Sequence, residues 1–170
     1  DLTVYDTDNA GALGGIQILA NANLLESILL DNVLIFGFTD GDALHLKSQN
    51  GGGLSYCSFK DIRVRHAKTG IHIEETTGGF VNSNSFYHGA VSGGGFDYCL
   101  HVEGGNNNVF NGTIFEPYSS VNGHLIIDKG SITGIDIRIE GNTQPTTIPL
   151  VAFASNTYGS QLTGVYSGGL

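Results

Sequence analysis

Two short sequence patterns recur along this chain of 170 residues, and they keep step with each other. The first is an apolar residue, two polar or turn-prone residues and a strand-like triplet, and its leading residues are Leu30, Phe59, Phe86, Phe110, Ile132 and Leu162. The second is an alternating apolar triplet that begins at Ile16, Leu44, Ile71, Leu100 and Leu125. Both recur every 22–30 residues, and periods of this size are typical of repeat architectures.

Each repeat contains short segments in which apolar and polar residues alternate, as strands do. Gly-rich segments such as 50–53 and 93–95 separate them. A repeat of this length leaves no room for the amphipathic helix of a β/α horseshoe, although residues 20–29 could form one short helix. The sequence therefore predicts an all-β fold, a right-handed single-stranded parallel β-helix of about six rungs.

The repeats divide the chain into a lead-in, residues 1–14, and a parallel β-helix, residues 15–170. The expected rungs are 15–40, 41–67, 68–95, 96–121, 122–146 and 147–170. The chain contains no Met and starts abruptly, which favours a fragment of a longer protein.

Equivalent positions of successive rungs predict continuous stacks inside the β-helix. The two apolar stacks expected are Leu30/Phe59/Phe86/Phe110/Ile132 and Leu44/Ile71/Leu100/Leu125. Asn84 and Asn108 each precede a stacked Phe by two positions, so we expect an amide ladder between them. Cys57 and Cys99 could form one disulfide, but two unlinked buried thiols are the favoured interpretation.

The charge balance excludes several classes of partner. Seven Lys and Arg oppose 16 Asp and Glu, which gives a net charge of −9. Phosphate-rich partners require a basic surface, so we expect neither nucleic acid nor an anionic membrane to bind. No apolar run approaches the roughly 18 residues of a membrane span.

One candidate site lies on the outward side of the second pattern. Alternation directs His45, His72 and His101 outward, and stacking places them in one column. The next outward positions are Lys47, Glu74, Glu103 and Asp128. Imidazoles beside carboxylates could contact sugar hydroxyls, transfer protons or bind a metal, or they could form a solvated or intersubunit face without a ligand.

We predict the three histidines as ligand-binding residues, with a neutral glycan lying along them because carboxylates repel an anionic polymer. Glu74 and Glu103 are the one pair nominated for catalysis, since glycoside hydrolysis requires two nearby carboxyl groups. No metal site and no cofactor are predicted.

A second outward patch follows the turn of the first pattern. Arg63 and Arg65 are predicted ligand-binding residues, because guanidinium groups bind carboxylates of acidic sugars. With Glu116 and Arg138 on later rungs they could instead form an ion-pair ladder. Tyr87, Tyr98 and Tyr118 lie near loops, where they could stack on sugar rings or serve packing alone.

Residues 106–116 read Asn-Asn-Asn-Val-Phe-Asn-Gly-Thr-Ile-Phe-Glu and are similar to the N-x-F-x-x-x-x-I-E rungs of known β-helices. Residues 70–74 and 98–104 are similar to their G-I-x-V-x-G strands. The chain thus resembles the pectate-lyase-like superfamily over residues 15–170, most of all the shaft of a bacteriophage tailspike or tail-fibre protein. The resemblance implies a homotrimer in a virion tail or outside the cell that binds host-surface polysaccharide, and in many members cleaves it.

The polygalacturonase motifs and the calcium-binding carboxylates of pectate lyases are absent, so no catalytic residue is carried over from the family. The leading hypothesis is a polysaccharide-recognising segment of a tailspike-like protein, with depolymerase activity left open. The alternatives are a secreted polysaccharide lyase or glycoside hydrolase, and a structural trimeric spacer.

Overall fold

The computed structural model describes residues 2–5, 14–118, 120–140, 149–164 and 166–168. These residues form strands and turns without any helix, so the all-β prediction is confirmed. Accordingly, no helix suited to crossing a membrane occurs among them. The short helix allowed at 20–29 is wrong: this segment ends one strand, forms a second and begins a third.

The described strands form three parallel sheets. Sheet A contains β1 (Leu2–Tyr5), β4 (Leu29–Phe36), β7 (Ser58–Arg65), β10 (Ser85–Tyr87), β11 (Ala90–Gly93), β13 (Asn108–Asn111), β14 (Ile114–Pro117), β16 (Ile132–Ile135), β17 (Arg138–Glu140), β19 (Gln161–Thr163) and β20 (Tyr166–Gly168). Sheet B contains β2 (Gly14–Asn21), β5 (Asp42–Gln49), β8 (Thr69–Glu75), β12 (Phe96–Glu103), β15 (Ser120–Gly130) and β18 (Val151–Thr157). Sheet C contains β3 (Leu24–Glu26), β6 (Gly53–Ser55) and β9 (Phe80–Asn82).

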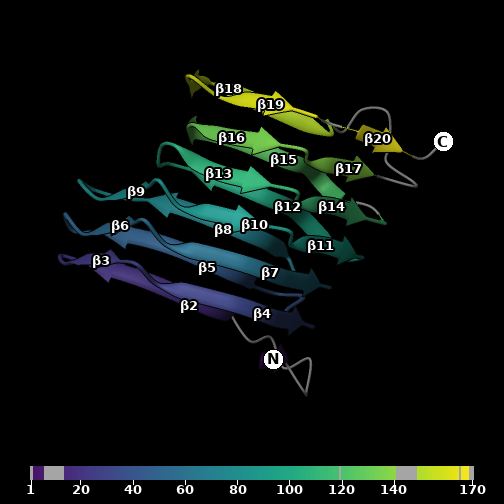
Figure 1. The fold of residues 1–170 in the computed structure, drawn as a ribbon, viewed down its shortest axis with the longest axis horizontal. Helices are drawn as coiled ribbons and strands as arrows, with labels where there is room; N and C mark the ends of the chain where they lie inside the picture. Colours follow the sequence, from purple (N-terminus) through teal and green to yellow (C-terminus); the bar gives the residue numbers. More distant parts are fainter. Residues whose placement is uncertain (1, 6–13, 119, 141–148, 165, 169–170) are drawn as a thin grey trace.

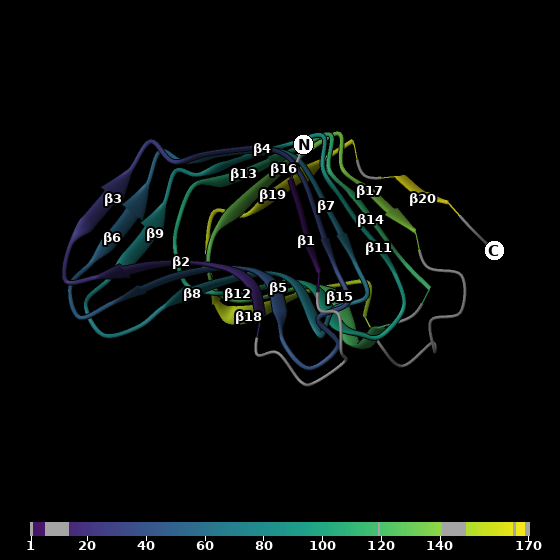
Figure 2. The same ribbon diagram turned by 90° about the horizontal axis from the view of Figure 1, so that it is seen from below.

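From β2 to β11 the chain visits sheets B, C and A in turn, and from β12 onward its described strands alternate between sheets B and A. Each strand pairs with its equivalent one turn away. The result is a parallel β-helix, as predicted from the repeat, with about five turns where about six rungs were expected. Figure 1 shows the turns stacked one above another, and Figure 2 looks along the stack, with the sheets as walls around the interior. Residues 2–5 of the expected lead-in form β1, which pairs with β4.

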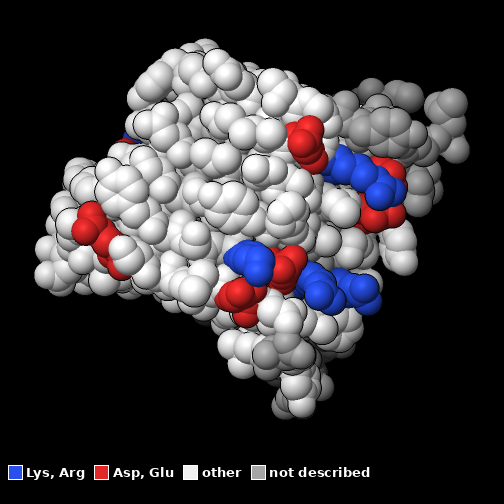
Figure 3. Space-filling view, viewed as in Figure 1, with Lys and Arg blue, Asp and Glu red and all other residues white. Residues whose placement is uncertain are grey.

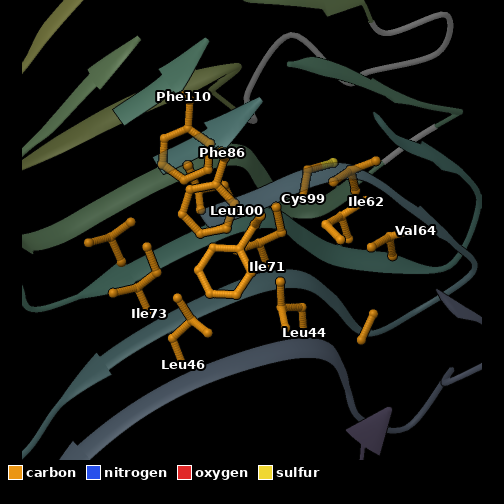
Figure 4. Packing of buried hydrophobic residues seen from close by; sticks show 14 of the residues in the cluster. Leu44, Leu46, Ile62, Val64, Ile71, Ile73, Phe86, Cys99, Leu100 and Phe110 are labelled. Carbon is orange, nitrogen blue, oxygen red and sulfur yellow. The ribbon is translucent and has the colours of Figure 1, made fainter. Parts of the chain in front are cut away.

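The interior contains the predicted apolar stacks. Leu44, Ile71, Leu100 and Leu125 are register partners in sheet B. In sheet A the rings of Phe59, Phe86 and Phe110 stack with centroids 4.8 and 4.4 Å apart. Figure 4 shows Phe86 and Phe110 packed above Leu100 and Ile71. Burial of these side chains is the main source of stability.

One member of the predicted Phe stack is wrong. Phe110 lies opposite Gly134, whereas Ile132 pairs with Asn108 two positions earlier. Leu162 and Ile137 fill the space at Gly134, because a Cβ there would lie 2.8 and 3.0 Å from their side-chain carbons. The fifth copy of the pattern therefore begins at Gly134.

A left-handed turn residue explains the first pattern. The third residue of each copy, after that correction, has a φ between 49° and 67°: Asn32, Asp61, His88, Gly112, Asp136 and Gly164. Gly, Asn and Asp tolerate this conformation better than most residues. In most turns of the β-helix this residue divides the sheet A segment into two strands. The two polar residues of the pattern lie at that division, between the apolar residues of the two strands.

The predicted amide ladder is also present. Asn84 is fully buried, and its Nδ2 donates to Oδ1 of Asn108 at 3.0 Å. Its own Oδ1 accepts from the backbone N–H of Cys57 at 3.0 Å. Cys57 and Cys99 are both free and buried, so the interpretation without a disulfide is confirmed. Burial raises the pKa of the Cys99 thiol.

Candidate functional site

The three predicted histidines form one column on the outer side of sheet B. His45, His72 and His101 are register partners on β5, β8 and β12. Their rings stack, with centroids 4.4 Å apart between His45 and His72 and 5.2 Å apart between His72 and His101. Tyr98 extends the stack against His101 at 4.3 Å. Because the strands pair in parallel register, three residues that are far apart in the sequence form one continuous surface.

Each histidine of this column is held by a carboxylate of the following turn. The Nε2 to carboxylate distances are 2.9 Å for His45–Glu74, 2.7 Å for His72–Glu103 and 2.8 Å for His101–Asp128. Asp128 reaches its histidine although a register shift places Lys129, not Asp128, opposite Glu103. The ring nitrogens that would contact a sugar are thus largely occupied within the column.

Asp42 is a member of the column that sequence reasoning missed. Its Oδ2 lies 2.8 Å from Nδ1 of His72 and 3.4 Å from Nδ1 of His45. The imidazole of His72 is consequently placed between two carboxylates, those of Asp42 and Glu103.

These contacts shift the pKa values of neighbouring histidines in opposite directions. Burial would lower the pKa of His72, but the hydrogen bonds and charges of Asp42 and Glu103 outweigh it and raise that pKa. Burial and the charge of His72 lower the pKa of His45. The stack therefore holds a proton more tightly on His72 than on His45.

The nominated catalytic pair, Glu74 and Glu103, occupies register positions on adjacent strands. Glu74 is engaged at both oxygens, by Nζ of Lys47 at 2.9 Å and by Nε2 of His45 at 2.9 Å. Burial would raise the pKa of Glu74, but the hydrogen bond and charge of Lys47 outweigh it and lower that pKa. An ionised carboxylate suits a nucleophile or a base and not a proton donor.

Arg63 and Arg65 lie on the outer side of sheet A and are not brought to the histidine column. Arg65 on β7 is in register with Ser92 on β11 and, one turn further, with Glu116 on β14. No salt bridge joins either arginine to a carboxylate within the part of the chain that the structure describes. Arg138 instead pairs with Glu140, so Arg63 and Arg65 are outside any ion-pair ladder there.

A groove of about 250 Å³ lies beside Arg65, where these strands of sheet A end. Its lining residues are Arg65, His66, Ser92, Gly93, Glu116 and Tyr118. Tyr118 is 63% exposed. Figure 3 shows that most of the charge on this side of the molecule lies at the lower centre and right of the view, apart from an acidic patch at the left edge, and that large areas between these groups are uncharged.

Glycine keeps the floor of this groove open. Gly93 has a φ of +106°, and a Cβ there would lie 3.3 Å from Cε1 of His66. His66 itself has a φ of 54° and is held through Nδ1 at 3.2 Å from the carbonyl oxygen of Gly94. His66 was not singled out in the sequence, although its place directly after Arg65 at the end of an alternating segment marks a turn.

The two surfaces offer different chemistry. The histidine column is a network of imidazole–carboxylate hydrogen bonds, whereas the Arg65 groove presents a guanidinium, a hydroxyl, a carboxylate and an aromatic ring to solvent. No family model, no curated protein and no solved structure matches the chain.

Proposed function

We propose that this β-helix binds polysaccharide, with the glycan lying in the Arg65 groove. One observation carries the proposal: Arg65 and the exposed Tyr118, which lie two turns apart, line the same groove. Arg65 has no carboxylate partner among the described residues. Aromatic faces beside polar side chains suit sugars, since a sugar ring has an apolar face and a polar rim.

The side chains of the groove favour a glycan that carries carboxylates. The Arg65 guanidinium can donate two parallel hydrogen bonds to the carboxylate of a uronic acid. The Ser92 hydroxyl and the Glu116 carboxylate, both lining the groove, can bind sugar hydroxyls. An acidic glycan is thus expected here, in contrast to the neutral glycan predicted for the histidine column.

The direction of the groove also suits a polymer. Arg65, Ser92 and Glu116 follow one another in register across three strands. Successive turns rise by about 4.8 Å, a step comparable with the repeat of sugars in a chain. A polysaccharide along the stack would therefore meet equivalent positions of several turns.

The similarity of the rungs to tailspike shafts supports a receptor-binding role for this segment, as part of a homotrimer on a virion. Light scattering would measure the mass: three chains of 17.9 kDa each are expected. A monomer at micromolar concentration would contradict the trimer for this chain but would leave glycan binding open.

Calorimetric titration with polygalacturonate oligosaccharides, and with neutral dextran oligosaccharides for comparison, tests the proposed binding. Arg65→Ala should weaken binding of the acidic oligosaccharide about 10–100-fold, because a hydrogen bond to a charged group contributes about 1.5–3 kcal/mol. Tyr118→Ala should weaken both ligand classes. Arg138→Gln, on the same sheet outside the groove, is the matched control and should leave affinity unchanged.

Full affinity in both groove variants would overturn the proposed site. Failure of the wild-type protein to bind a broad panel of acidic and neutral glycans would overturn the proposed function.

A further inference from the structure

The geometry of Asp42, His45 and His72 is that of a ligand set. One carboxylate oxygen and two imidazole nitrogens, one from each residue, all lie within 4.8 Å of one another. Their side chains are only 21%, 13% and 13% exposed. They stand on adjacent strands of a rigid parallel sheet, so the cluster is preorganised by the backbone register.

The outer hydrogen bonds determine which nitrogens face the centre of the cluster. Nε2 of His45 is bonded to Glu74 at 2.9 Å, and Nε2 of His72 to Glu103 at 2.7 Å. A carboxylate accepts hydrogen bonds, so these contacts place the Nε2 protons on the imidazoles. Both Nδ1 atoms lie toward the single carboxylate of Asp42.

At His45 this arrangement brings two electron-rich atoms together. Neutral His45 with a proton on Nε2 has a lone pair on Nδ1, which lies 3.4 Å from Oδ2 of Asp42. The amide nitrogen of Gln17 approaches the same Nδ1 at 3.2 Å and can donate one hydrogen bond. A cation at this position would replace the Gln17 hydrogen bond at Nδ1 and would also attract the negatively charged carboxylate of Asp42.

We propose that Asp42, His45 and His72 bind one divalent transition-metal ion, with Zn²⁺ as the best fit, through a carboxylate oxygen and the two Nδ1 atoms. Two imidazoles, one carboxylate and a fourth position for water form a common zinc coordination sphere. Ligand atoms around tetrahedral zinc lie about 3.3 Å apart. The separation of 3.4 Å from Asp42 to His45 is close to this value. The separation of 2.8 Å from Asp42 to His72 is that of a hydrogen bond and would have to lengthen slightly when an ion replaces the shared proton.

The partners of the Nε2 atoms support the proposal independently. Histidines that bind metals almost always donate the other ring N–H to a carboxylate or carbonyl, which fixes the ring and makes the ligand nitrogen more basic. Glu74 and Glu103 hold His45 and His72 in this way. The ion takes the place of the proton that His72 Nδ1 shares with Asp42.

A second group, His72, His101 and Glu103, also has three ligand atoms within 4.8 Å. It shares His72 with the first group, and its carboxylate is 43% exposed. Here Nε2 of His72 faces the carboxylate while Nδ1 of His101 lies 3.9 Å from it, so the arrangement is looser. One ion per chain is expected, at the Asp42 group.

The experiment is calorimetric titration of ZnCl₂ into the 170-residue chain, after removal of any polyhistidine tag and of metal by EDTA. The expected result is one ion per chain and a higher melting temperature in its presence. Asp42→Asn and His45→Asn should abolish this binding. Glu74→Gln should weaken it about 10–100-fold, as removal of an outer hydrogen-bond partner does.

His101→Asn is the matched control, because it removes a histidine of the same column that belongs only to the second group. It should keep wild-type zinc affinity, and circular dichroism should show strand content unchanged in every variant. Absence of binding to the wild-type chain would overturn the proposal. The proposal would also be overturned if His101→Asn lost zinc binding while Asp42→Asn kept it, because the ion would then lie at the second group.

Discussion

Nδ2 of Asn84 donates to Oδ1 of Asn108 on the next turn at 3.0 Å, in the buried corner that leads into sheet A. The same Nδ2 lies 3.3 Å from the carbonyl oxygen of Leu54, and Oδ1 of Asn84 accepts from the backbone of Cys57. Three turns are therefore joined through one amide.

Replacing Asn84 with Ala should lower the free energy of unfolding by at least about 2 kcal/mol, because buried polar groups lose their partners at about 1–3 kcal/mol each. Asn111→Ala, at an outward position beside Phe110, should change it by less than about 0.5 kcal/mol. Urea unfolding followed by circular dichroism measures both. Equal effects would show that the ladder contributes no specific stability.

The ring of Phe86 is enclosed by those of Phe59 and Phe110 and is 2% exposed. Phe86→Ala should cost about 3–5 kcal/mol, because it removes a large apolar side chain and leaves a cavity between the two remaining rings. Phe86→Leu should cost less, since Leu fills part of that space. The same urea titration checks the order, and a small effect of the Ala variant would contradict the stacked core.

The histidine column should titrate unevenly in the metal-free protein. In an NMR titration of the imidazole signals, the pKa of His72 should lie above the ordinary value of 6.5 and that of His45 below it. A raised folded-state pKa means that the stability contributed by His72 is fully present below pH 6.5 and is lost as pH rises through its folded pKa.

For His45 the sign is reversed: its contribution is present above pH 6.5 and is lost as pH falls through its lowered folded pKa. His72→Gln should thus reduce the decline on the alkaline side, whereas His45→Gln should reduce the part of the acidic decline that begins just below pH 6.5. The pH dependence of urea unfolding in EDTA checks both variants. An unchanged profile in His72→Gln would show that its ion pairs add nothing to stability.

Gly93 and Gly94 provide a matched pair at the Arg65 groove. Gly93→Ala should destabilise the protein by about 1–3 kcal/mol, because its positive φ is strained for any residue with a Cβ. At Gly94 an added Cβ would meet Tyr118 Cδ2 at an ordinary 3.7 Å, so Gly94→Ala should be tolerated. Thermal unfolding distinguishes the two variants. Equal melting temperatures would contradict the strained positive φ described for Gly93.

The fold was predictable because its signals are local and repeated. Alternation fixes which side chains of Leu44 and His45 face inward or outward, and the period fixes which residues of other turns they meet. The Phe stack was predicted correctly as far as Phe110. The register partner of Phe110 was missed because Gly134 carries no side chain. The apolar Ile132, two positions earlier, fitted the sequence pattern instead.

The sites were less predictable because they depend on departures from alternation. Ala43 and Leu44 are both buried, and this break directs Asp42 outward to the histidines, where strict alternation would have placed it inside. The Arg65 groove is completed by His66 and Tyr118, which follow strands and whose directions no period determines. Only the turn conformations reveal that they share a groove with Glu116.

Burial declines from the middle turns to both ends of the stack. On β8 the first three residues are buried, whereas no residue of β18 is buried and only one of β2 is. In a repeat protein each turn is stabilised chiefly by its two neighbours, so a terminal turn lacks half of that support. Amide hydrogens of β2 and β18 should therefore exchange with solvent long before those of β8, and the protein should open one turn at a time from its ends.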